Sequence, residues 1–472
     1  MTSLPDFKQN VLGPLWRGEQ PTVDLPVTLF AAEFDHPLDY IFESERWDGI
    51  SGASRRLARA GDKLRTILAN DGYVVGDLLH NSPGSIFALC HDEGMAQRWA
   101  AAIERAVAQE TDIVTVSTVV QTLTVSQLTR GLYRMPHSVI GVPGVNDYQE
   151  RINRYYGLAS PSTVPSADAI AQRRHFGEVV ALVHGLLRRA SESRQILPFY
   201  EALPFVERCA SCGKRPAERL DADKFPICGV CLRKRSEAIS PALQHAGVIW
   251  LEAVGLQQLL ERQRSVSSYQ RLCVELNETL HKAIPAGVVV LSAGSGCMAL
   301  LASAAQVLEA AIEALESITT HYSLKAPVAF AASVALSAAP GNYRALTALA
   351  RESAAHVRRT VDGTASVLDI RLLDHPFDRF RKPYSLDEAQ QLIAGISLIR
   401  EAKLADDLFP DLPAQASRGT AGLYYTFERS KLPQSAQQTL QRLERLWDMG
   451  AVPGPRFFAM LSTALILARV RN

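Results

Sequence analysis

The chain has little of three things that mark specialised classes of protein. It has seven cysteines in 472 residues, too few for a secreted fold held by many disulfides. It has almost no excess charge, because 50 Lys and Arg face 49 Asp and Glu. A highly charged disordered chain and a uniformly basic nucleic-acid binder are therefore both excluded. Hydrophobic residues make up 47% of the chain, which is enough to form buried cores. The length allows several domains, each with its own core.

The chain also lacks a clear membrane segment. Residues 1–20 show no basic start followed by an apolar run, so we expect no signal peptide and a cytoplasmic protein. Residues 283–308 carry no charge, but Pro285, Gly287 and Gly294 interrupt them. A strand, a glycine turn, a second strand and a helix explain this run better than a spanning helix does.

Apolar periodicity indicates the same order of elements twice. Residues 27–134 and 246–384 each predict a strand, a helix, two strands joined by a turn, a helix and a strand. This pattern is typical of α+β sheet domains. Residues 1–26 predict a proline-containing arm, residues 135–245 a helical linker with a cysteine module, and residues 385–472 a bundle of helices.

Four of the cysteines form two close pairs separated by 15 residues. A C-x2-C pair brings two thiolates to one tetrahedral metal ion from a single turn, and two such pairs complete a closed structural zinc site. Two redox-active pairs or free buried thiols are the alternative interpretation. We favour zinc, with no open position for catalysis. The ligands are Cys209, Cys212, Cys228 and Cys231.

Basic residues crowd this module. They predict a local phosphate-binding patch that contacts RNA, while a solvated surface with a helix C-terminus explains them equally well. The candidates are Lys214, Arg215, Arg219, Arg233, Lys234 and Arg235. In the preceding linker, Tyr155 and Tyr156 lie close to Arg151 and Arg154. That arrangement suits either stacking on single-stranded RNA or an ordinary helix surface.

Two short glycine motifs are weak candidates for binding phosphate. The Gly294-Ser295-Gly296 motif lacks the ending of a P-loop and falls in a predicted hairpin. The Gly52-Ala53-Ser54 motif is predicted to open a helix, where free backbone N–H groups attract an anion. A helical first turn made of small capping residues is the alternative. The nucleotide-binding candidates are therefore Gly52, Ala53 and Ser54.

Several of these motifs occur together in one known family. Residues 35–42 read Asp-His-Pro-Leu-Asp-Tyr-Ile-Phe and precede Gly52-Ala53-Ser54, and Arg381-Lys382-Pro383-Tyr384 precedes the last helices. With the duplicated sheets and the cysteine module between them, the chain resembles the large subunit of type III CRISPR effector complexes. The resemblance implies two ferredoxin-like palm domains, at 27–134 and 246–384, a zinc ribbon between them and a C-terminal helical domain.

The chain departs from the family at the hairpin of the second palm. Active members make cyclic oligoadenylates from ATP there, at a G-G-D-D motif that holds two metal ions. Here the residues are Ala293, Gly294, Ser295 and Gly296, and Glu252 is the one acid on the opposed strand. A single carboxylate cannot clamp two metals. We therefore expect a degenerate cyclase site with no catalytic residues.

The resemblance also leads us to expect no HD nuclease domain, because the first sheet follows residues 1–26 directly. The dipeptide His91-Asp92 is predicted to lie in a loop. The chain is therefore predicted not to be an enzyme. An active nucleotidyltransferase that uses Glu252 with further acids is the alternative in another class.

The partners follow from the same resemblance. We expect a cytoplasmic scaffold of prokaryotic antiviral defence that binds the guide RNA at its 5′ end and contacts the target RNA. It would also contact a small helical subunit and the backbone-capping subunit, and no membrane. A stand-alone zinc-ribbon protein that binds RNA outside a CRISPR complex is the remaining alternative.

Overall fold

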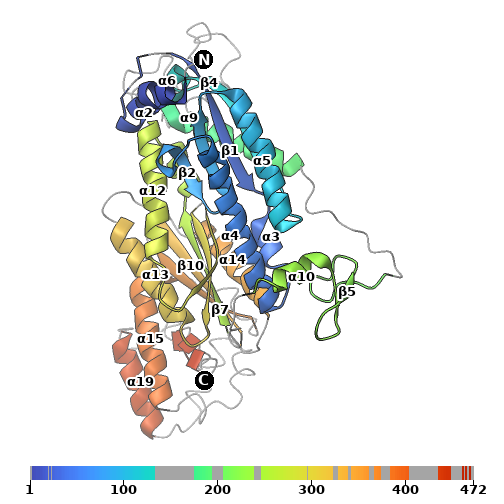
Figure 1. Cartoon of the computed structure of the whole chain (residues 1–472). Coiled ribbons are helices and arrows are strands. Elements are labelled where there is room, and N and C mark those ends of the chain that lie inside the picture. Colours follow the sequence, from blue (N-terminus) through green and yellow to red (C-terminus); the bar gives the residue numbers. More distant parts are fainter. Residues whose placement is uncertain are drawn as a thin grey trace, which may run out of the picture. The chain divides into compact units, whose positions relative to one another are not determined.

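The structure is a computed structural model and describes most of the chain (Figure 1). The described ranges are 3–19, 21–22, 24–132, 175–193, 206–238, 246–294, 296–322, 328–337, 342–360, 366–373, 383–402, 434–447, 460–461, 463–464 and 467–468. Several residues named above lie outside the described residues: Arg151, Arg154, Tyr155, Tyr156, Ser295, Arg381 and Lys382.

The chain forms two compact units, each drawn from three stretches of sequence. Unit 1 combines Met1–Pro37, Arg56–Phe199 and Leu256–Asn277. Unit 2 combines Leu38–Arg55, Tyr200–Gly255 and Glu278–Asn472. The consecutive domain boundaries drawn from the sequence stay a prediction. Each unit has its own sheet.

Unit 1 is built on a four-stranded antiparallel sheet in the order β2-β3-β1-β4. The strands are β1 (Pro26–Phe34), β2 (Leu78–Ser82), β3 (Ser85–Cys90) and β4 (Val116–Thr124). The helices that join them are α4 (Trp47–Asn70) and α5 (Glu93–Thr111). Gly84, with φ of +88°, completes the tight turn between β2 and β3, a conformation that suits glycine. This is the element order predicted for residues 27–134.

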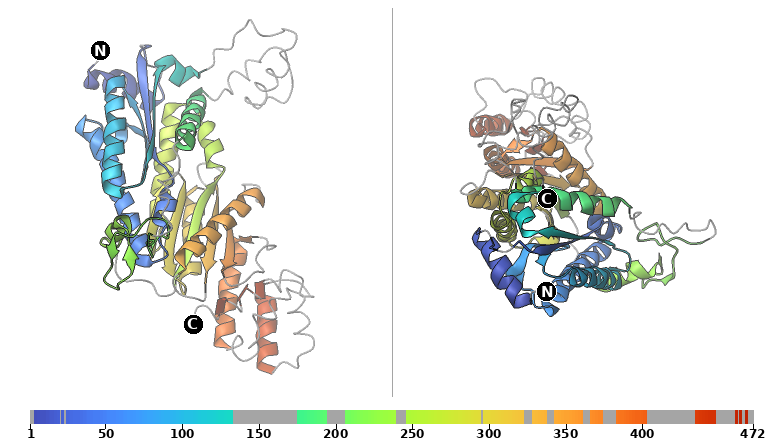
Figure 2. Two further views of the ribbon diagram at one scale, coloured as in Figure 1. Left: turned by 90° about the vertical axis from the view of Figure 1, so that its right-hand side faces the viewer. Right: turned by 90° about the horizontal axis from the view of Figure 1, so that it is seen from above.

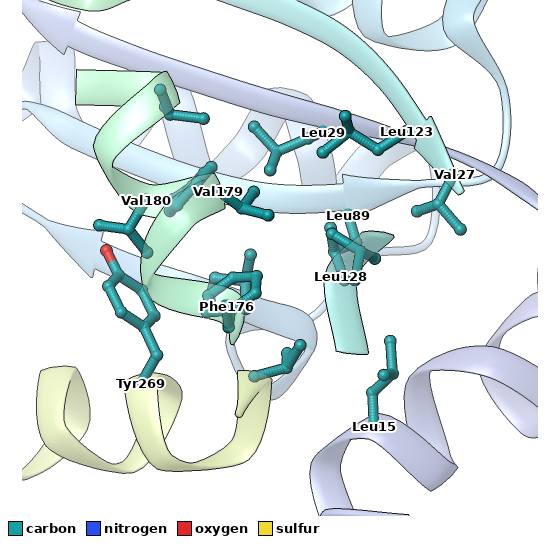
Figure 3. Close-up of a cluster of buried hydrophobic side chains, with 14 of the residues drawn as sticks. Leu15, Val27, Leu29, Leu89, Leu123, Leu128, Phe176, Val179, Val180 and Tyr269 are labelled. Atoms are coloured by element: carbon teal, nitrogen blue, oxygen red, sulfur yellow. The ribbon is translucent and has the colours of Figure 1, made fainter. Parts of the chain in front are cut away.

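Helices cover both faces of this sheet (Figure 2). On one face, Phe30 of β1 meets Trp99 of α5 edge-on, with ring centroids 5.5 Å apart. On the other face, Leu29 belongs to a buried cluster with Phe176 and Tyr269, whose rings are 5.4 Å apart (Figure 3). These two aromatic residues come from α9 (His175–Ser193) and α12 (Val266–Lys282). Successive strand residues point to opposite faces, so β1 supplies apolar side chains to both layers.

The N-terminal residues are part of this core, which corrects the prediction of an arm. They form α1 (Leu4–Phe7), a π-helical turn η1 (Lys8–Leu12) and α2 (Gly13–Arg17). Phe7, Leu12 and Leu15 are at most 2% exposed and join the same buried cluster. The Lys8 ammonium adds an ion pair to Asp77 at 2.6 Å. Short helices interrupted by proline lack the long apolar period that a sequence prediction needs.

The entry into α5 explains the dipeptide His91-Asp92. Asp92 is the N-cap of α5, and its carboxylate accepts hydrogen bonds from the backbone N–H groups of Gly94 and Met95, both at 3.1 Å. These bonds satisfy two donors that a helix start leaves without an intrahelical partner. Asp92 therefore has a local structural role.

Unit 2 is built on a six-stranded sheet in the order β12-β11-β10-β7-β9-β8. The strands are β7 (Ala246–Val254), β8 (Val289–Gly294), β9 (Cys297–Ser303), β10 (Ala329–Leu336), β11 (Val367–Leu372) and β12 (Tyr384–Ser385). Strands β10 and β11 are parallel, and the other neighbours are antiparallel. The order β8-β9-β7-β10 repeats the order of unit 1. Strands β11 and β12 extend one edge and were not predicted.

Helices α13 (Val307–Tyr322) and α14 (Tyr343–Thr360) cover opposite faces of this sheet. A Cβ added to Gly247 of β7 would lie 2.7 Å from a methyl group of Val307 in α13, so Gly247 faces that helix. Trp250, which has the opposite parity along β7, lies 5.8 Å from the Arg351 guanidinium of α14. The parity of the strand therefore separates the two layers.

The described part of the tail is helical, as predicted for residues 385–472. It contains α15 (Leu386–Glu401) and α19 (Gln434–Leu446). The indole N–H of Trp447 donates to the Gln391 carbonyl at 2.9 Å. A Cβ at Gly395 would lie 2.4 Å from the same indole ring, so only glycine admits the ring at this place on α15.

An α+β fold is therefore confirmed. Helix α4 begins at Trp47, before the Gly52-Ala53-Ser54 motif that is predicted to open a helix, and β2 begins at Leu78 after a short 3-10 turn, η2 (Val75–Asp77). The remaining helices described in unit 1 are α6 (Val125–Arg130) and α11 (Leu256–Glu261). In the part of the chain that the structure describes, no helix is both long and apolar enough to cross a bilayer.

Acid is expected to weaken unit 1 through His80 of β2, whose Nε2 lies 3.0 Å from the Ser82 hydroxyl. Burial, with a contribution from nearby His184, lowers the pKa of His80 from 6.5 to about 4. The unfolded chain then binds this proton more readily than the folded chain. The stability that neutral His80 contributes is complete above about pH 6.5 and is lost as the pH falls toward 4.

Urea unfolding at pH 7 and pH 5 measures this effect. The His80→Gln variant is expected to lose less free energy of unfolding between the two pH values than the original chain. His184→Gln is the companion variant, because burial also lowers the pKa of His184. An unchanged pH dependence in His80→Gln would contradict the assignment.

Candidate metal centre and hairpin face

The four paired cysteines of unit 2 come together as predicted. Their Sγ atoms lie within 4.8 Å of one another, and all four residues are buried. A tetrahedral zinc ion with Zn–S bonds of about 2.3 Å needs sulfur atoms roughly 3.8 Å apart. The cluster therefore has the ligand type, number and spacing of a closed metal site. The ligands are Cys209, Cys212, Cys228 and Cys231.

Local structure places each pair. The first pair lies on a turn that Gly213 closes, with φ of +66° and a 2.8 Å hydrogen bond from its N–H to the Cys209 carbonyl. In the second pair, Cys228 is the N-cap of α10 (Gly229–Arg235). A small hairpin of β5 (Arg219–Leu220) and β6 (Pro226–Ile227) connects the two pairs. We call residues 206–238 the ribbon.

Hydrogen bonds among the four thiols shift their pKa values in opposite directions. Hydrogen bonding with Cys212 lowers the pKa of Cys209, and hydrogen bonding with Cys209 raises that of Cys231. The guanidinium of Arg215 lies 3.8 Å from the Cys212 sulfur and 3.7 Å from the Cys228 sulfur. A site with four thiolates and one zinc ion carries two negative charges, so a cation at this place stabilises the deprotonated ligands.

A buried carboxylate ties the ribbon to the segment 38–55 of the same unit. Glu43 accepts from Arg215 at 2.5 Å and from Lys234 at 3.0 Å. The Lys234 ammonium also donates to the Tyr40 carbonyl at 2.7 Å and lies 3.7 Å from the Tyr40 ring centroid. The side chains of Glu43 and Lys234 are 0% exposed. Three buried charges are tolerated here because they are paired and hydrogen-bonded.

The two cations of this cluster respond differently to burial. Burial lowers the pKa of Lys234, and the attraction of Glu43 opposes that shift without cancelling it. Burial also lowers the pKa of Arg215, but the hydrogen bond to Glu43, the charge of Glu43 and the nearby cysteine sulfurs together outweigh it, so the net pKa is raised. Both side chains are therefore held by Glu43 rather than by solvent.

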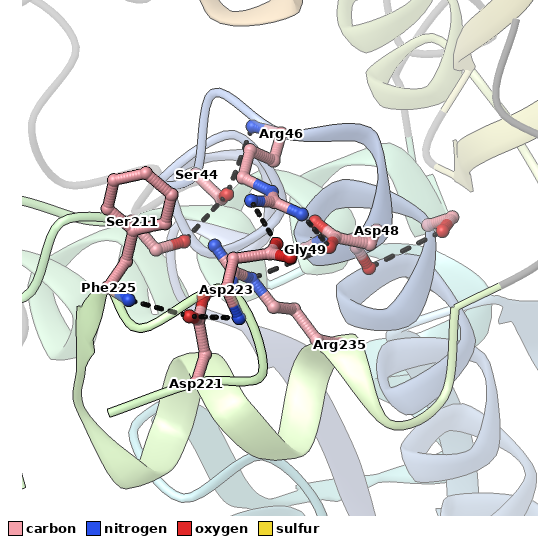
Figure 4. A network of polar contacts seen from close by, with 10 residues as sticks. Ser44, Arg46, Asp48, Gly49, Ser211, Asp221, Asp223, Phe225 and Arg235 are labelled. Carbon is pink, nitrogen blue, oxygen red and sulfur yellow. Dashed lines mark hydrogen bonds and ion pairs between the residues drawn. The ribbon is translucent and has the colours of Figure 1, made fainter. Parts of the chain in front are cut away.

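Further polar contacts join the ribbon to the segment 38–55 (Figure 4). The Ser44 and Ser211 hydroxyl oxygens lie 2.9 Å apart in a buried hydrogen bond. Arg46 reaches Asp48 at 3.1 Å and Asp223 of the ribbon at 3.5 Å. The segment 38–55 therefore contacts the ribbon through both buried and exposed polar groups.

The structure corrects the basic patch predicted around the cysteines. Arg215 and Lys234 are 6% and 0% exposed and pair with Glu43, so they are not available to a phosphate. Arg235 pairs with Asp221 and Asp48. The remaining candidates, Lys214, Arg219 and Arg233, are exposed. The sequence could not separate the two groups, because Glu43 lies 172 residues before Arg215.

The Gly52-Ala53-Ser54 motif does not open a helix, which corrects the prediction of helix-end phosphate binding. Helix α4 begins at Trp47, so the N–H groups of the motif lie inside the helical hydrogen-bond ladder. Gly52 instead admits the ribbon, since an added Cβ would lie 1.7 Å from the Lys234 carbonyl oxygen. Ala53 is buried, and Ser54 donates to the Leu291 carbonyl of β8 at 2.7 Å.

The predicted hairpin lies between β8 and β9. Ala293 pairs with Met298, and Gly294 pairs with Cys297. Gly296 has φ of +78°, which a two-residue turn requires and glycine tolerates. Ser295 lies outside the described residues. The hairpin position is confirmed, and its described residues carry no carboxylate.

Glu252 of β7 is the acid nearest the hairpin in register, because it pairs with Cys297. Its carboxylate binds Arg358 of α14 at 2.8 Å and is partly exposed, at 18%. The Trp250 indole lies 3.4 Å from the same carboxylate. The sequence singles out Glu252 but gives no role to Arg358, which approaches it only because α14 packs on this face.

Comparison with known proteins gives matches in structure alone. No protein-family model matches the chain, and no curated protein matches it. A crystal structure of a Csm1–Csm4 cassette in complex with cA4 is 11% identical, with a TM-score of 0.49, over 94% of this chain and 70% of that chain. Csm1 in T. onnurineus is 11% identical, with a TM-score of 0.48, over the same shares.

A third match is the Csm1–Csm4 subcomplex in the type III-A CRISPR-Csm interference complex. It is 12% identical, with a TM-score of 0.47, over 98% of this chain and 71% of that chain. Csm1 is named in all three matched structures, and the third is described as part of a type III-A CRISPR-Csm interference complex.

The cysteine cluster is expected to hold one zinc ion per chain. Cys228→Ser removes one of four thiolates and is expected to lower both the bound zinc and the thermal stability, because a structural site needs all four ligands. Elemental analysis and thermal unfolding of the purified chain measure the two effects. Cys297→Ser, outside the cluster, is the matched control, and equal zinc content in both variants would contradict the site.

Gly52→Ala is expected to destabilise the chain by about 2 kcal/mol or more, because the new Cβ meets a backbone carbonyl that cannot move alone. Gly185→Ala is the control in another helix, where no atom lies within 4 Å of the added Cβ. That change is expected to stabilise by roughly 0.5–1 kcal/mol. Urea unfolding measures the free energy of unfolding of both variants. Changes of the same sign would refute the tight packing of Gly52 against the ribbon.

Proposed function

We propose that the chain is a large subunit of a type III CRISPR effector complex that scaffolds the complex without making cyclic oligoadenylate. The repeated strand order of the two sheets supports two ferredoxin-like palm domains. The cysteine cluster between them in sequence supports a zinc ribbon. In this proposal the chain binds the guide RNA at its 5′ end and contacts the target RNA, the small helical subunit and the backbone-capping subunit.

The state of Glu252 carries the proposal of lost catalysis. Two-metal transfer of a nucleotide needs several carboxylates that bridge both ions. In the described residues of β7, β8 and β9, Glu252 is the one acid. Its carboxylate is already paired with Arg358. A guanidinium at this place offsets the charge of the carboxylate and disfavours a divalent cation beside it.

The packing of α14 adds to this argument. Arg351 and Arg358 approach Trp250 and Glu252 from α14, so the face of the sheet that bears Glu252 is covered by a helix. A nucleotide and two metal ions would need this helix to move. The same face therefore serves as packing surface in the proposed scaffold.

The proposal is tested on the purified chain incubated with ATP and Mg²⁺ or Mn²⁺. No cyclic oligoadenylate is expected, either from the original chain or from Arg358→Ala, because release of one carboxylate still leaves a single metal ligand. Co-expression with the other effector subunits is expected to recover the chain together with guide RNA. Mass spectrometry of the products and of the bound RNA gives the readouts.

Two outcomes would overturn different parts of the proposal. A cyclic product that Glu252→Ala abolishes would show an active nucleotidyltransferase with acids that we have not identified. Recovery of the chain without guide RNA or other subunits would favour a stand-alone zinc-ribbon protein. Glu278→Ala, at an exposed acid of α12 that pairs with Lys282 of the same helix, is the control substitution.

A further inference from the structure

The hairpin of the ribbon exposes two large apolar side chains. Leu220 of β5 is 60% exposed, and Phe225, directly before β6, is 53% exposed. Ile227, two residues further on, is 1% exposed, so the ribbon does bury an apolar side chain where its packing permits. Exposure of two large apolar residues at one end of so small a module indicates a surface that another molecule covers.

The charges of this end are unbalanced. Its two acids each have a cationic partner, since Asp221 pairs with Arg235 and Asp223 forms an exposed pair with Arg46. Arg219 and Lys224 are exposed, and neither forms an ion pair with a described carboxylate. The end of the hairpin therefore presents two cations beside an aromatic ring.

The backbone at the tip holds this arrangement in place. The Asp221 carboxylate accepts from the backbone N–H groups of Asp223 at 3.0 Å and of Phe225 at 2.8 Å. Lys224 between them has φ of +63°, a left-handed conformation that glycine adopts more easily. The strained position thus carries a charged side chain where glycine would fit without strain.

We propose that the end of this hairpin binds single-stranded RNA, with Phe225 stacked on a base and Arg219 and Lys224 on neighbouring phosphates. The inference rests on the proposed function and names the surface that contacts RNA. An exposed aromatic ring beside unpaired cations is the combination that single strands use, because every base offers a face for stacking. Paired bases in a duplex do not offer that face.

The rest of the ribbon makes the surface rigid. One cysteine pair precedes the hairpin in the sequence and the other pair follows it. Glu43 holds the ribbon through Arg215 and Lys234. A surface that is already ordered loses little conformational entropy on binding. The centre of a protein–protein interface is instead depleted of charge, which favours RNA over a protein as the occupant.

The test is fluorescence anisotropy of a labelled oligouridine with the purified full chain at low salt. Phe225→Ala is expected to weaken RNA binding roughly tenfold. Phe225→Tyr is expected to retain binding, because tyrosine also offers an aromatic ring for stacking. Lys224→Gly is expected to weaken binding and lower the salt dependence by about one phosphate contact. The same change relieves the left-handed strain, so its thermal stability should stay equal or rise.

The controls are an exposed apolar residue and an exposed cation of unit 1. Val75→Ala, at a residue 61% exposed, and Arg188→Ala, at a side chain 81% exposed, are expected to leave binding unchanged. Crosslinking of 4-thiouridine RNA should map to peptides that contain residues 219–227.

Two results would overturn the inference. If Phe225→Ala and Lys224→Gly bind RNA as tightly as the original chain, the RNA surface lies elsewhere while the proposed function stands. If the original chain binds no single-stranded RNA at low salt, the hairpin surface is left to a protein partner. Assembly with guide RNA, measured separately, then decides whether the scaffold role also fails.

Discussion

The Glu43 carboxylate is the contact on which the arrangement of the ribbon depends. It lies fully buried between Arg215, which also approaches two of the cysteine sulfurs, and Lys234, which follows the last cysteine on α10. Loss of one partner from such a buried cluster costs about 3–5 kcal/mol, because the remaining charge stays uncompensated. The cysteine cluster, the helix after it and the segment 38–55 are therefore coupled through one acid.

The same segment reaches the sheet of unit 2. Helix α4 passes close to the ribbon at Gly52 and then donates through Ser54 to the Leu291 carbonyl of β8. Two positions of one short motif thus serve packing and strand contact. In the sequence this motif suggests phosphate binding. In the structure Gly52 is required because any side chain there would collide with the ribbon backbone.

The hairpin between β8 and β9 carries no carboxylate in its described residues. Glycine still forms the turn at Gly296, and the register of β7 still brings Glu252 opposite the start of β9. The remaining carboxylate is neutralised by Arg358 of the covering helix. The acid at this place is thus paired with a cation of the helix that packs beside it.

Much of the fold could be predicted from periodicity, and the exceptions have local causes. Strand β11 was not predicted, and its polar residues Asp369 and Arg371 are 1% and 7% exposed. The Asp369 carboxylate accepts from Ser353 at 2.6 Å and from Arg371 at 2.8 Å. These bonds satisfy the buried groups, and a single-sequence pattern carries no sign of them.

The amino-acid sequence alone determined the four thiol ligands, the hairpin without acids and the duplicated order of elements. These features depend on residue types at short spacing, where the geometry of a turn or a strand is nearly constant. The tertiary structure alone decided which of the predicted cations are buried against a carboxylate. Glu43 lies 172 and 191 residues from its two partners, and pairing over such distances depends on the folded path of the whole chain. Arg219 and Lys224 remain at the surface because the fold brings no carboxylate to them among the described residues.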